Sequence, residues 1–200
     1  MSRATFLFRA AQLNVLVLCG VLLGGFAFQF VSGELPCPLC MLQRHAMMLC
    51  ALGPAFLIAR ARHGEMQYRD VATGYGLTVL AAVAGASVSV RQILLHIVPP
   101  DPGYGGTVLG LHVYTWALLV FVAELIAAGL NLTFAGGLEG HRIEWGTDAR
   151  LVLGLLGFAI LANAAVVFVE AGLHVSLDDN PDRYKLFYDL GILRNTPTRR

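Results

Sequence analysis

Charge is scarce in this chain. Of its 200 residues, 14% are charged and 56% are hydrophobic, whereas an average soluble domain carries roughly 25% charged residues. The few charges include no basic tract interleaved with aromatic residues, so nothing in the sequence suggests a nucleic acid as a partner. The shortage of charge excludes a water-soluble globule and predicts a membrane protein.

The sequence also lacks internal repeats, low-complexity stretches and polar connections long enough to fold separately. No clear small-residue cleavage site follows the first apolar run, so we interpret that run as a retained span. Runs of about 20 apolar residues, the length that crosses the hydrocarbon core, predict spans along the chain. They are Ala10–Val31, Leu39–Ile58, Val71–Val90 extending towards His96, Leu111–Leu132 and Leu151–Leu173. We expect one all-α domain at 1–173, a polytopic membrane helical bundle, followed by a tail at 174–200.

Arginines fall unevenly on the two sides of these spans. Cytoplasmic connections are enriched in Lys and Arg, and one side collects Arg3, Arg9, Arg60, Arg62, Arg69, Arg142 and Arg150. The other side has Arg44, Arg91 and a tail that mixes basic with acidic residues. This predicts a cytoplasmic N-terminus and an outer tail. Four spans would require an interfacial Leu151–Leu173, but that segment holds no charge before Glu170, which favours five.

Cysteine is limited to four residues, and they are not equivalent. Cys19 and Cys50 fall within apolar runs, where a thiol usually behaves as a small hydrophobe. Cys37 and Cys40 form a Cys-x-x-Cys unit between the first two spans, on the side where thiols meet an oxidising compartment. Pro38 suits the first turn of the next helix, and the dipole and free N–H groups of a helix N-terminus stabilise a thiolate. The pair therefore predicts thiol–disulfide exchange.

A cysteine pair can also form a structural disulfide, bind a metal or attach a haem. A structural disulfide stays open. A zinc site is disfavoured because zinc takes four ligands, and the nearby His45 falls inside the second predicted helix. Haem attachment requires His directly after the second cysteine, where Met41 stands. We therefore expect no metal at this site.

Arg44 lies one helical turn beyond Cys40 on the same predicted face. A cation at this depth is costly unless it is paired or functional. Its guanidinium would stabilise a thiolate at Cys40 or the charge that develops on an electron acceptor. The alternative is that Arg44 extends to the headgroups of membrane lipid.

Residues 35–44 read Leu-Pro-Cys-Pro-Leu-Cys-Met-Leu-Gln-Arg. This string resembles the signature of the disulfide bond formation protein B (DsbB) family of bacterial inner-membrane quinone reductases. A looser likeness runs through residues 91–99, which read Arg-Gln-Ile-Leu-Leu-His-Ile-Val-Pro. The resemblance implies a four-helix DsbB-like core, to which the fifth predicted span is an addition.

The resemblance also implies a chemistry. In that family the Cys-x-x-Cys disulfide passes electrons to ubiquinone or menaquinone, and a second periplasmic cysteine pair meets a soluble thioredoxin-fold (DsbA-like) partner. Cys37 would be the exchange cysteine and Cys40 would face the quinone. The loop Pro99–Gly110 and the tail hold no cysteine, however. The second pair is missing, so we expect a divergent member whose single pair meets its reductant directly.

Polar residues at the end of the third predicted span offer hydrogen-bond donors for quinone carbonyls. Gln92 and His96 share a helix face, and the resemblance implies a histidine on this stretch. We rank Arg44 first as a quinone contact, then His96, with Gln92 and Arg91 in support. Aromatic residues that follow, such as Trp116, fit an interfacial belt equally well.

Two carboxylates fall within predicted spans, Glu124 in the fourth and Glu170 near the outer end of the fifth. Intramembrane carboxylates are functional hypotheses by default. We interpret Glu124 as a protonated acid that packs between helices, with proton delivery to a reduced quinone as the alternative.

The sequence as a whole predicts a multi-pass inner-membrane oxidoreductase with a cytoplasmic N-terminus and a periplasmic Cys-x-x-Cys. It would oxidise periplasmic dithiols and pass the electrons to a quinone. Two alternatives stay open: a non-catalytic scaffold with a structural disulfide, and a quinol-dependent enzyme that works in the reducing direction.

Overall fold

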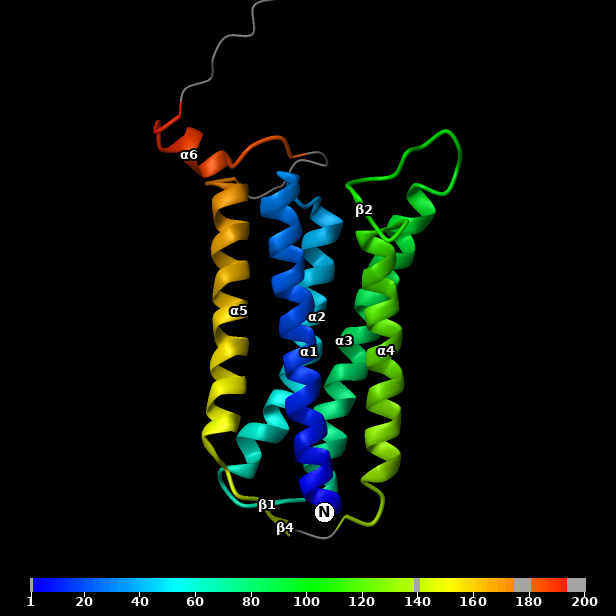
Figure 1. Ribbon diagram of the computed structural model, residues 1–200, viewed down its shortest axis with the longest axis vertical. Coiled ribbons are helices and arrows are strands. Elements are labelled where there is room, and N and C mark those ends of the chain that lie inside the picture. The colour runs from blue at the N-terminus through cyan, green and yellow to red at the C-terminus, as the bar shows by residue number, and fades with distance from the viewer. Residues whose placement is uncertain (1, 139–140, 175–180, 194–200) are drawn as a thin grey trace, which may run out of the picture.

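The computed structural model describes residues 2–138, 141–174 and 181–193, and its main feature is a bundle of long helices (Figure 1). The helices are α1 (Arg3–Ser32), α2 (Pro38–Ala61), α3 (Tyr68–Leu95), α4 (Val113–Phe134) and α5 (Thr147–Ala171). All five are long and apolar enough to cross a membrane. The prediction of an all-α polytopic membrane bundle with a fifth long helix is confirmed. Helices α1 and α2 extend beyond their predicted runs at both ends, whereas α4 starts two residues after its run and α5 ends two residues before the end of its run.

Short elements connect the helices at the two ends of the bundle. At the end where the chain starts, β1 (Glu65–Met66) pairs antiparallel with β4 (His141–Arg142). At the opposite end, β2 (Thr107–Val108) pairs with β3 (Leu111–His112), and the short helix α6 (Lys185–Asp189) follows α5. We call the first end the basic end and the second the cysteine end. The cysteine end holds residues 33–37, 96–112 and 172–193, apart from the undescribed 175–180.

The connection between α1 and α2 is set by local sequence. Gly33 ends α1 with φ 69°, a left-handed conformation that glycine adopts without steric cost. Pro38 occupies the first turn of α2, where its missing N–H removes no helical hydrogen bond. Cys37 is thereby the N-cap residue of α2.

Small residues allow α2 and α3 to approach closely. A Cβ added at Gly53 would overlap the carbonyl oxygen of Gly74, so the two backbones are in direct contact there. The Thr78 hydroxyl donates to the Cys50 carbonyl oxygen across the same interface, at 3.0 Å. Small-residue contacts of this kind are the usual basis of helix packing in membranes. They fix α3 relative to α2, and hence Gln92 relative to the cysteines.

Helix α5 packs on the opposite side of the bundle, against α1 and, less extensively, α2 (Figure 1). Beyond it, the Leu173 N–H donates to Asp189 of α6 at 2.9 Å. The division into a bundle at 1–173 and a tail at 174–200 stays a prediction, and residues 175–180 and 194–200 of that tail lie outside the described residues.

Candidate redox site at the cysteine end

The site is built around the two sulfur atoms at the start of α2. Cys37 and Cys40 are both thiols, and their Sγ atoms lie 2.7 Å apart. The Cys40 N–H donates to Cys37 Sγ at 3.2 Å, so the first sulfur caps the helix. Cys37 is 5% exposed. Its hydrogen bond to Cys40, together with burial, raises the pKa of the Cys37 thiol. The direction of this shift favours the proton on Cys37 and the negative charge on Cys40 when the pair loses one proton.

Gln92 of α3 contacts both sulfurs. Its Nε2 donates to Cys37 Sγ at 3.3 Å and to Cys40 Sγ at 3.4 Å. Gln43, one turn beyond Cys40, donates to Gln92 Oε1 at 2.9 Å and fixes the orientation of the amide. Both glutamines are almost fully buried. The arrangement places an N–H donor where charge develops when the disulfide opens.

Arg44 lies one turn below the sulfurs and points across the bundle to α1. Its Nη1 donates to Gln29 Oε1 at 2.8 Å and its Nη2 to the Gly25 carbonyl oxygen at 3.1 Å. The guanidinium also lies over the Phe26 ring, 5.2 Å from its centroid. These partners are neutral, so the positive charge of Arg44 is oriented without being compensated by them.

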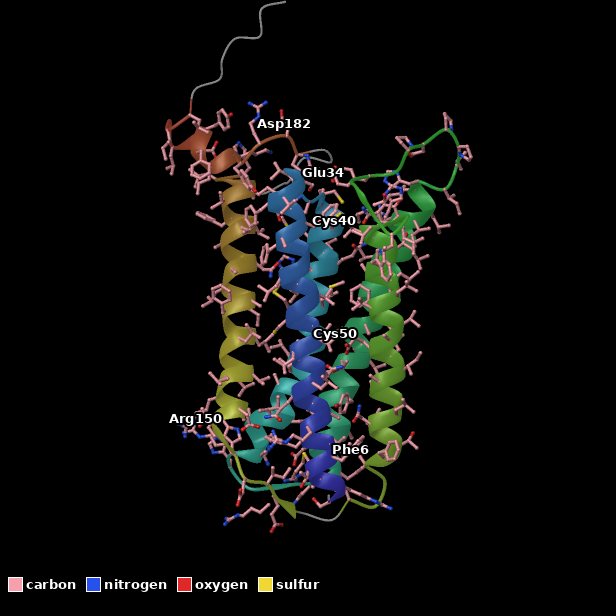
Figure 2. The ribbon with its side chains drawn as sticks, viewed as in Figure 1. Phe6, Glu34, Cys40, Cys50, Arg150 and Asp182 are labelled. Atoms are coloured by element: carbon pink, nitrogen blue, oxygen red, sulfur yellow. The ribbon has the colours of Figure 1, made fainter. Side chains whose placement is uncertain are left out.

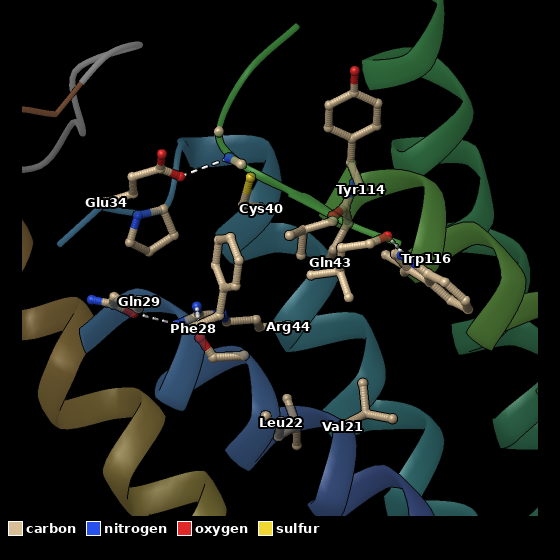
Figure 3. Close-up of a pocket in the computed structure, with 18 of the residues that line it drawn as sticks. Val21, Leu22, Phe28, Gln29, Glu34, Cys40, Gln43, Arg44, Tyr114 and Trp116 are labelled. Atoms are coloured by element: carbon tan, nitrogen blue, oxygen red, sulfur yellow. Dashed lines mark hydrogen bonds between the residues drawn. The ribbon is translucent and has the colours of Figure 1, made fainter. Parts of the chain in front are cut away.

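A cavity of about 350 Å³ opens beside Cys40 (Figure 3). Its wall comes from α1, α2, α4 and the loop before α4, and it is mostly apolar, with contributions from Phe28, Tyr114 and Trp116. The polar side chains of Gln43 and Arg44 also line it. An apolar cavity with a few convergent polar groups is the usual form of a small-molecule site.

The remaining predicted site residues lie away from this cavity. His96 ends α3, where its Nδ1 lies 3.0 Å from Asp101 Oδ2 and its ring stacks on Tyr114 at 5.9 Å. Arg91 is exposed on α3. Neither lines the cavity, and neither does Gln92, which is predicted to support quinone binding and instead contacts the sulfurs. Of the predicted residues, the structure brings together Cys37, Cys40, Arg44 and Gln92.

The loop between α3 and α4 is tied over the α1–α2 connection. The Tyr104 hydroxyl donates to the Leu35 carbonyl oxygen at 2.7 Å, and the Gly106 N–H donates to Glu34 Oε2 at 2.7 Å. Burial, with the nearby anionic groups, raises the pKa of Tyr104, which stays a neutral phenol. At the loop's far side, the Gly103 N–H and His96 lower the pKa of Asp101. The sequence carries no motif for these tethers.

Cys19 and Cys50 are fully buried within the bundle (Figure 2 labels Cys50 and Cys40). The Cys50 thiol lies 3.8 Å from the Thr78 carbonyl oxygen, well below the site. Glu124, in α4, accepts two hydrogen bonds from Asn14 Nδ2, at 3.1 and 3.0 Å. The contacts of Cys50 and Glu124 thus join different helices of the bundle.

Comparison with known sequences decides the family. The profile described as Disulfide bond formation protein DsbB matches residues 8–107, from α1 to the loop before α4. The chain belongs to the DsbB family. The matched residues include the cysteine pair, Arg44 and Gln92; α4 and α5 follow them.

Individual relatives extend the match. "Disulfide bond formation protein B" of Chromohalobacter salexigens is 34% identical over 155 residues, which cover 73% of this chain and 81% of the relative. The protein of the same name from Aromatoleum aromaticum is 30% identical, over 72% of this chain and 81% of the relative. The one from Polaromonas naphthalenivorans is 28% identical, over 78% of this chain and 92% of the relative. No solved structure matches the chain. The protein is thus a multi-pass membrane protein of a disulfide bond formation family.

Proposed function

We propose that the protein oxidises dithiols of a soluble thioredoxin-fold partner on the outer face of the inner membrane and passes the electrons to a membrane quinone. The observation that carries the proposal is the position of Cys40, which is bonded by Gln92 and also forms part of the cavity wall. The uneven distribution of arginines supports a cytoplasmic N-terminus, which puts the cysteine end in the periplasm.

The cavity fits the head of a quinone in its chemistry. Its aromatic and aliphatic wall suits a planar ring, and Arg44 and Gln43 provide N–H donors for carbonyl oxygens. A quinone bound there, ubiquinone or menaquinone, supplies a two-electron, two-proton acceptor next to Cys40. We expect Arg44 and Gln43 to hold it, because His96 and Arg91 lie outside the wall.

The cycle on the chain's own residues starts from a Cys37–Cys40 disulfide. A partner thiolate attacks Cys37 Sγ, the S–S bond breaks, and its electron pair stays on Cys40 as a thiolate. The α2 N-terminus, Gln92 and the charge of Arg44 stabilise that thiolate. The partner's second thiol then displaces Cys37, which takes up a proton, and the partner leaves with its own disulfide.

Access to Cys37 is the demanding step, because the sulfur is 5% exposed and this chain has no second cysteine pair to relay electrons. The loop held by Tyr104 and Gly106 lies over the connection that carries Cys37. A partner must therefore displace this loop to reach the sulfur.

The test is anaerobic mixing of the purified protein with a quinone and a reduced thioredoxin-fold protein, with quinol formation followed by absorbance. We expect quinol in proportion to the dithiol oxidised, with none from Cys37→Ala or Cys40→Ala and normal yields from Cys19→Ala and Cys50→Ala. A parent protein that forms no quinol and oxidises no dithiol would support the scaffold alternative. Quinol consumption with reduction of the partner's disulfide would reverse the proposed direction.

A further inference from the structure

Glu170 is a buried carboxylate without a hydrogen-bond partner. It is the penultimate residue of α5, at the outer end, and is 1% exposed. Among the residues that the structure describes, neither of its oxygen atoms has a partner. Buried polar groups are nearly always satisfied, and the other intramembrane carboxylate, Glu124, is bonded to Asn14. Glu170 therefore requires an explanation that packing does not give.

The surroundings of Glu170 connect it to the candidate site. Helix α5 packs against α1 and α2. Gln29 of α1 accepts from Arg44 and also donates to the hydroxyl of Tyr184, in the segment that follows α5, so Arg44 and the outer end of α5 lie on the same side of the site. The positive charge of Arg44 favours a negative charge on either Cys40 or Glu170. Cys40 and Glu170 also repel each other when both are ionised. Arg44 is thus the one cation beside two groups that can each carry a negative charge, Cys40 on α2 and Glu170 on α5.

Arg44 keeps its charge under all relevant conditions. Its hydrogen-bond partners are the neutral oxygen atoms of Gln29 and Gly25. A partly buried cation without a counter-charge is costly, and so is a second anion beside the first. One negative charge is therefore the favoured state of this site, but Cys40 can supply it only after the disulfide has opened.

We propose that Glu170 is the alternating counter-charge of the redox site, ionised while Cys37 and Cys40 form a disulfide and protonated while Cys40 is a thiolate. The inference rests on the proposed redox role of the pair. Reduction transfers two electrons from the partner dithiol to the disulfide; one of its two protons goes to Cys37 and the other to Glu170. Re-oxidation releases both protons. Glu170 is a positioning residue that acts through the charge of Arg44.

Other titratable groups around Glu170 do not replace it. Tyr184, the residue before α6, accepts a hydrogen bond from Gln29 at 3.2 Å, and Tyr104, on the loop, is a neutral phenol. Glu34 is exposed and accepts from the Gly106 N–H. Beyond the end of α5, His174 lies 3.4 Å from Asp189.

The test measures the equilibrium between the cysteine pair of the purified, quinone-free protein and dithiothreitol, by trapping free thiols at several pH values. Between about pH 6 and 8, where the thiols of dithiothreitol stay protonated, the parent takes up both protons, so its equilibrium constant is independent of pH. Glu170→Gln has no second acceptor, and reduction releases one proton to solvent. The equilibrium constant for reduction of its cysteine pair should therefore rise roughly tenfold for each unit increase in pH. The matched control, Glu124→Gln, should behave like the parent.

A pH-independent constant in Glu170→Gln overturns the inference and leaves the proposed function intact, whereas a parent pair that dithiothreitol cannot reduce overturns the proposed function. Infrared difference spectra of the parent provide a second measurement if the variant does not fold. Reduction should produce the band of a protonated carboxyl group, and its absence contradicts the role of Glu170.

Discussion

The two ends of the bundle differ in whether their key charged side chains contact a group of opposite charge. At the basic end, Arg9 pairs with Asp148, and Arg60 Nε lies 3.3 Å from Asp70. Trp145 lies between two further arginines, with guanidinium groups 5.3 and 5.2 Å from its ring centroid. Charges with such partners hold helices and connections together and leave no group available for chemistry.

At the cysteine end, ion pairs such as His96–Asp101 lie at the periphery, whereas Arg44 and Glu170 have no counter-ion in contact among the described residues. Arg44 is bonded to neutral oxygens, and Glu170 has no hydrogen-bond partner among the described residues. Uncompensated charge near a membrane is expensive. The difference indicates that one end serves stability and the other serves the redox pair, and the variants below test that division from the largest expected effect to the smallest.

Replacement of a site cysteine should have the largest effect. Cys40→Ala removes the resolving sulfur and leaves Cys37 to attack the disulfide of oxidised partner, which releases the partner's other cysteine as a thiol and holds partner as a mixed disulfide that non-reducing electrophoresis would detect. Cys37→Ala should trap no partner, and Cys19→Ala should behave like the parent. Equal trapping by both site variants would contradict the assignment of Cys37 as the exchange cysteine.

Removal of the Arg44 charge should come next. Charge-assisted hydrogen bonds contribute about 1.5–3 kcal/mol, so Arg44→Ala should raise the quinone KM by roughly ten- to a hundredfold. Arg44→Lys keeps the charge without the planar fork and should lie between this variant and the parent. Unchanged quinone kinetics in both variants would reduce Arg44 to a lipid anchor.

Gln92 tests whether the amide contact to the sulfurs matters. A neutral hydrogen bond contributes about 0.5–1.5 kcal/mol, so Gln92→Ala should slow oxidation of the partner by roughly three- to tenfold. Gln12 at the basic end donates to Asp148 at 2.9 Å, and Gln12→Ala is the control expected to keep the parent rate. Equal rates in all three proteins would make Gln92 a packing residue.

The Tyr104 tether should have a smaller effect on access. Tyr104→Phe loses the hydrogen bond to the Leu35 carbonyl oxygen, and the loop over Cys37 should open more often. Alkylation of reduced Cys37 by an impermeant reagent should be a few times faster in this variant, in proportion to the roughly 1 kcal/mol of a neutral hydrogen bond. A slower reaction would mean that the tether exposes the sulfur and does not cover it.

At the basic end, a broken pair should change stability and leave the chemistry intact. Asp70 accepts from Arg60 and caps α3 by accepting from the Gln67 N–H at 3.1 Å. Asp70→Ala should lower the free energy of unfolding by about 1–2 kcal/mol, measured by thermal unfolding in detergent. The quinone KM should stay at the parent value, and a large change in it would contradict the division between the two ends.

Much of the fold was predictable because hydrophobic length in a membrane is a strong constraint. The five spans, the cysteine pair at the start of α2 and the position of Arg44 all follow from local patterns. The sequence does not predict the site roles of Gln29 and Gln43, because a buried amide has no sequence signature until its partner on another helix is known. The same holds for the tethers of Tyr104 and Glu34, which join segments far apart in the chain.

The likeness to the family also predicts a role for His96, since it implies a histidine near the end of the third span. In the structure, Gln92 contacts the sulfurs and His96 lies beside Asp101 at the helix end. One turn of α3 separates these positions, and helix packing, which local sequence does not specify, decides which of them faces Cys37.

The most direct test of the central claim is the redox state of the cysteine pair in native membranes that contain or lack quinone. Thiols would be trapped by acid and alkylated, and the Cys37–Cys40 disulfide would be read from the mass of the fragment that carries it. We predict that the pair is oxidised when quinone is present and accumulates as dithiol when quinone is absent and partner is supplied reduced. A pair whose redox state is the same in both membranes would contradict electron transfer to quinone.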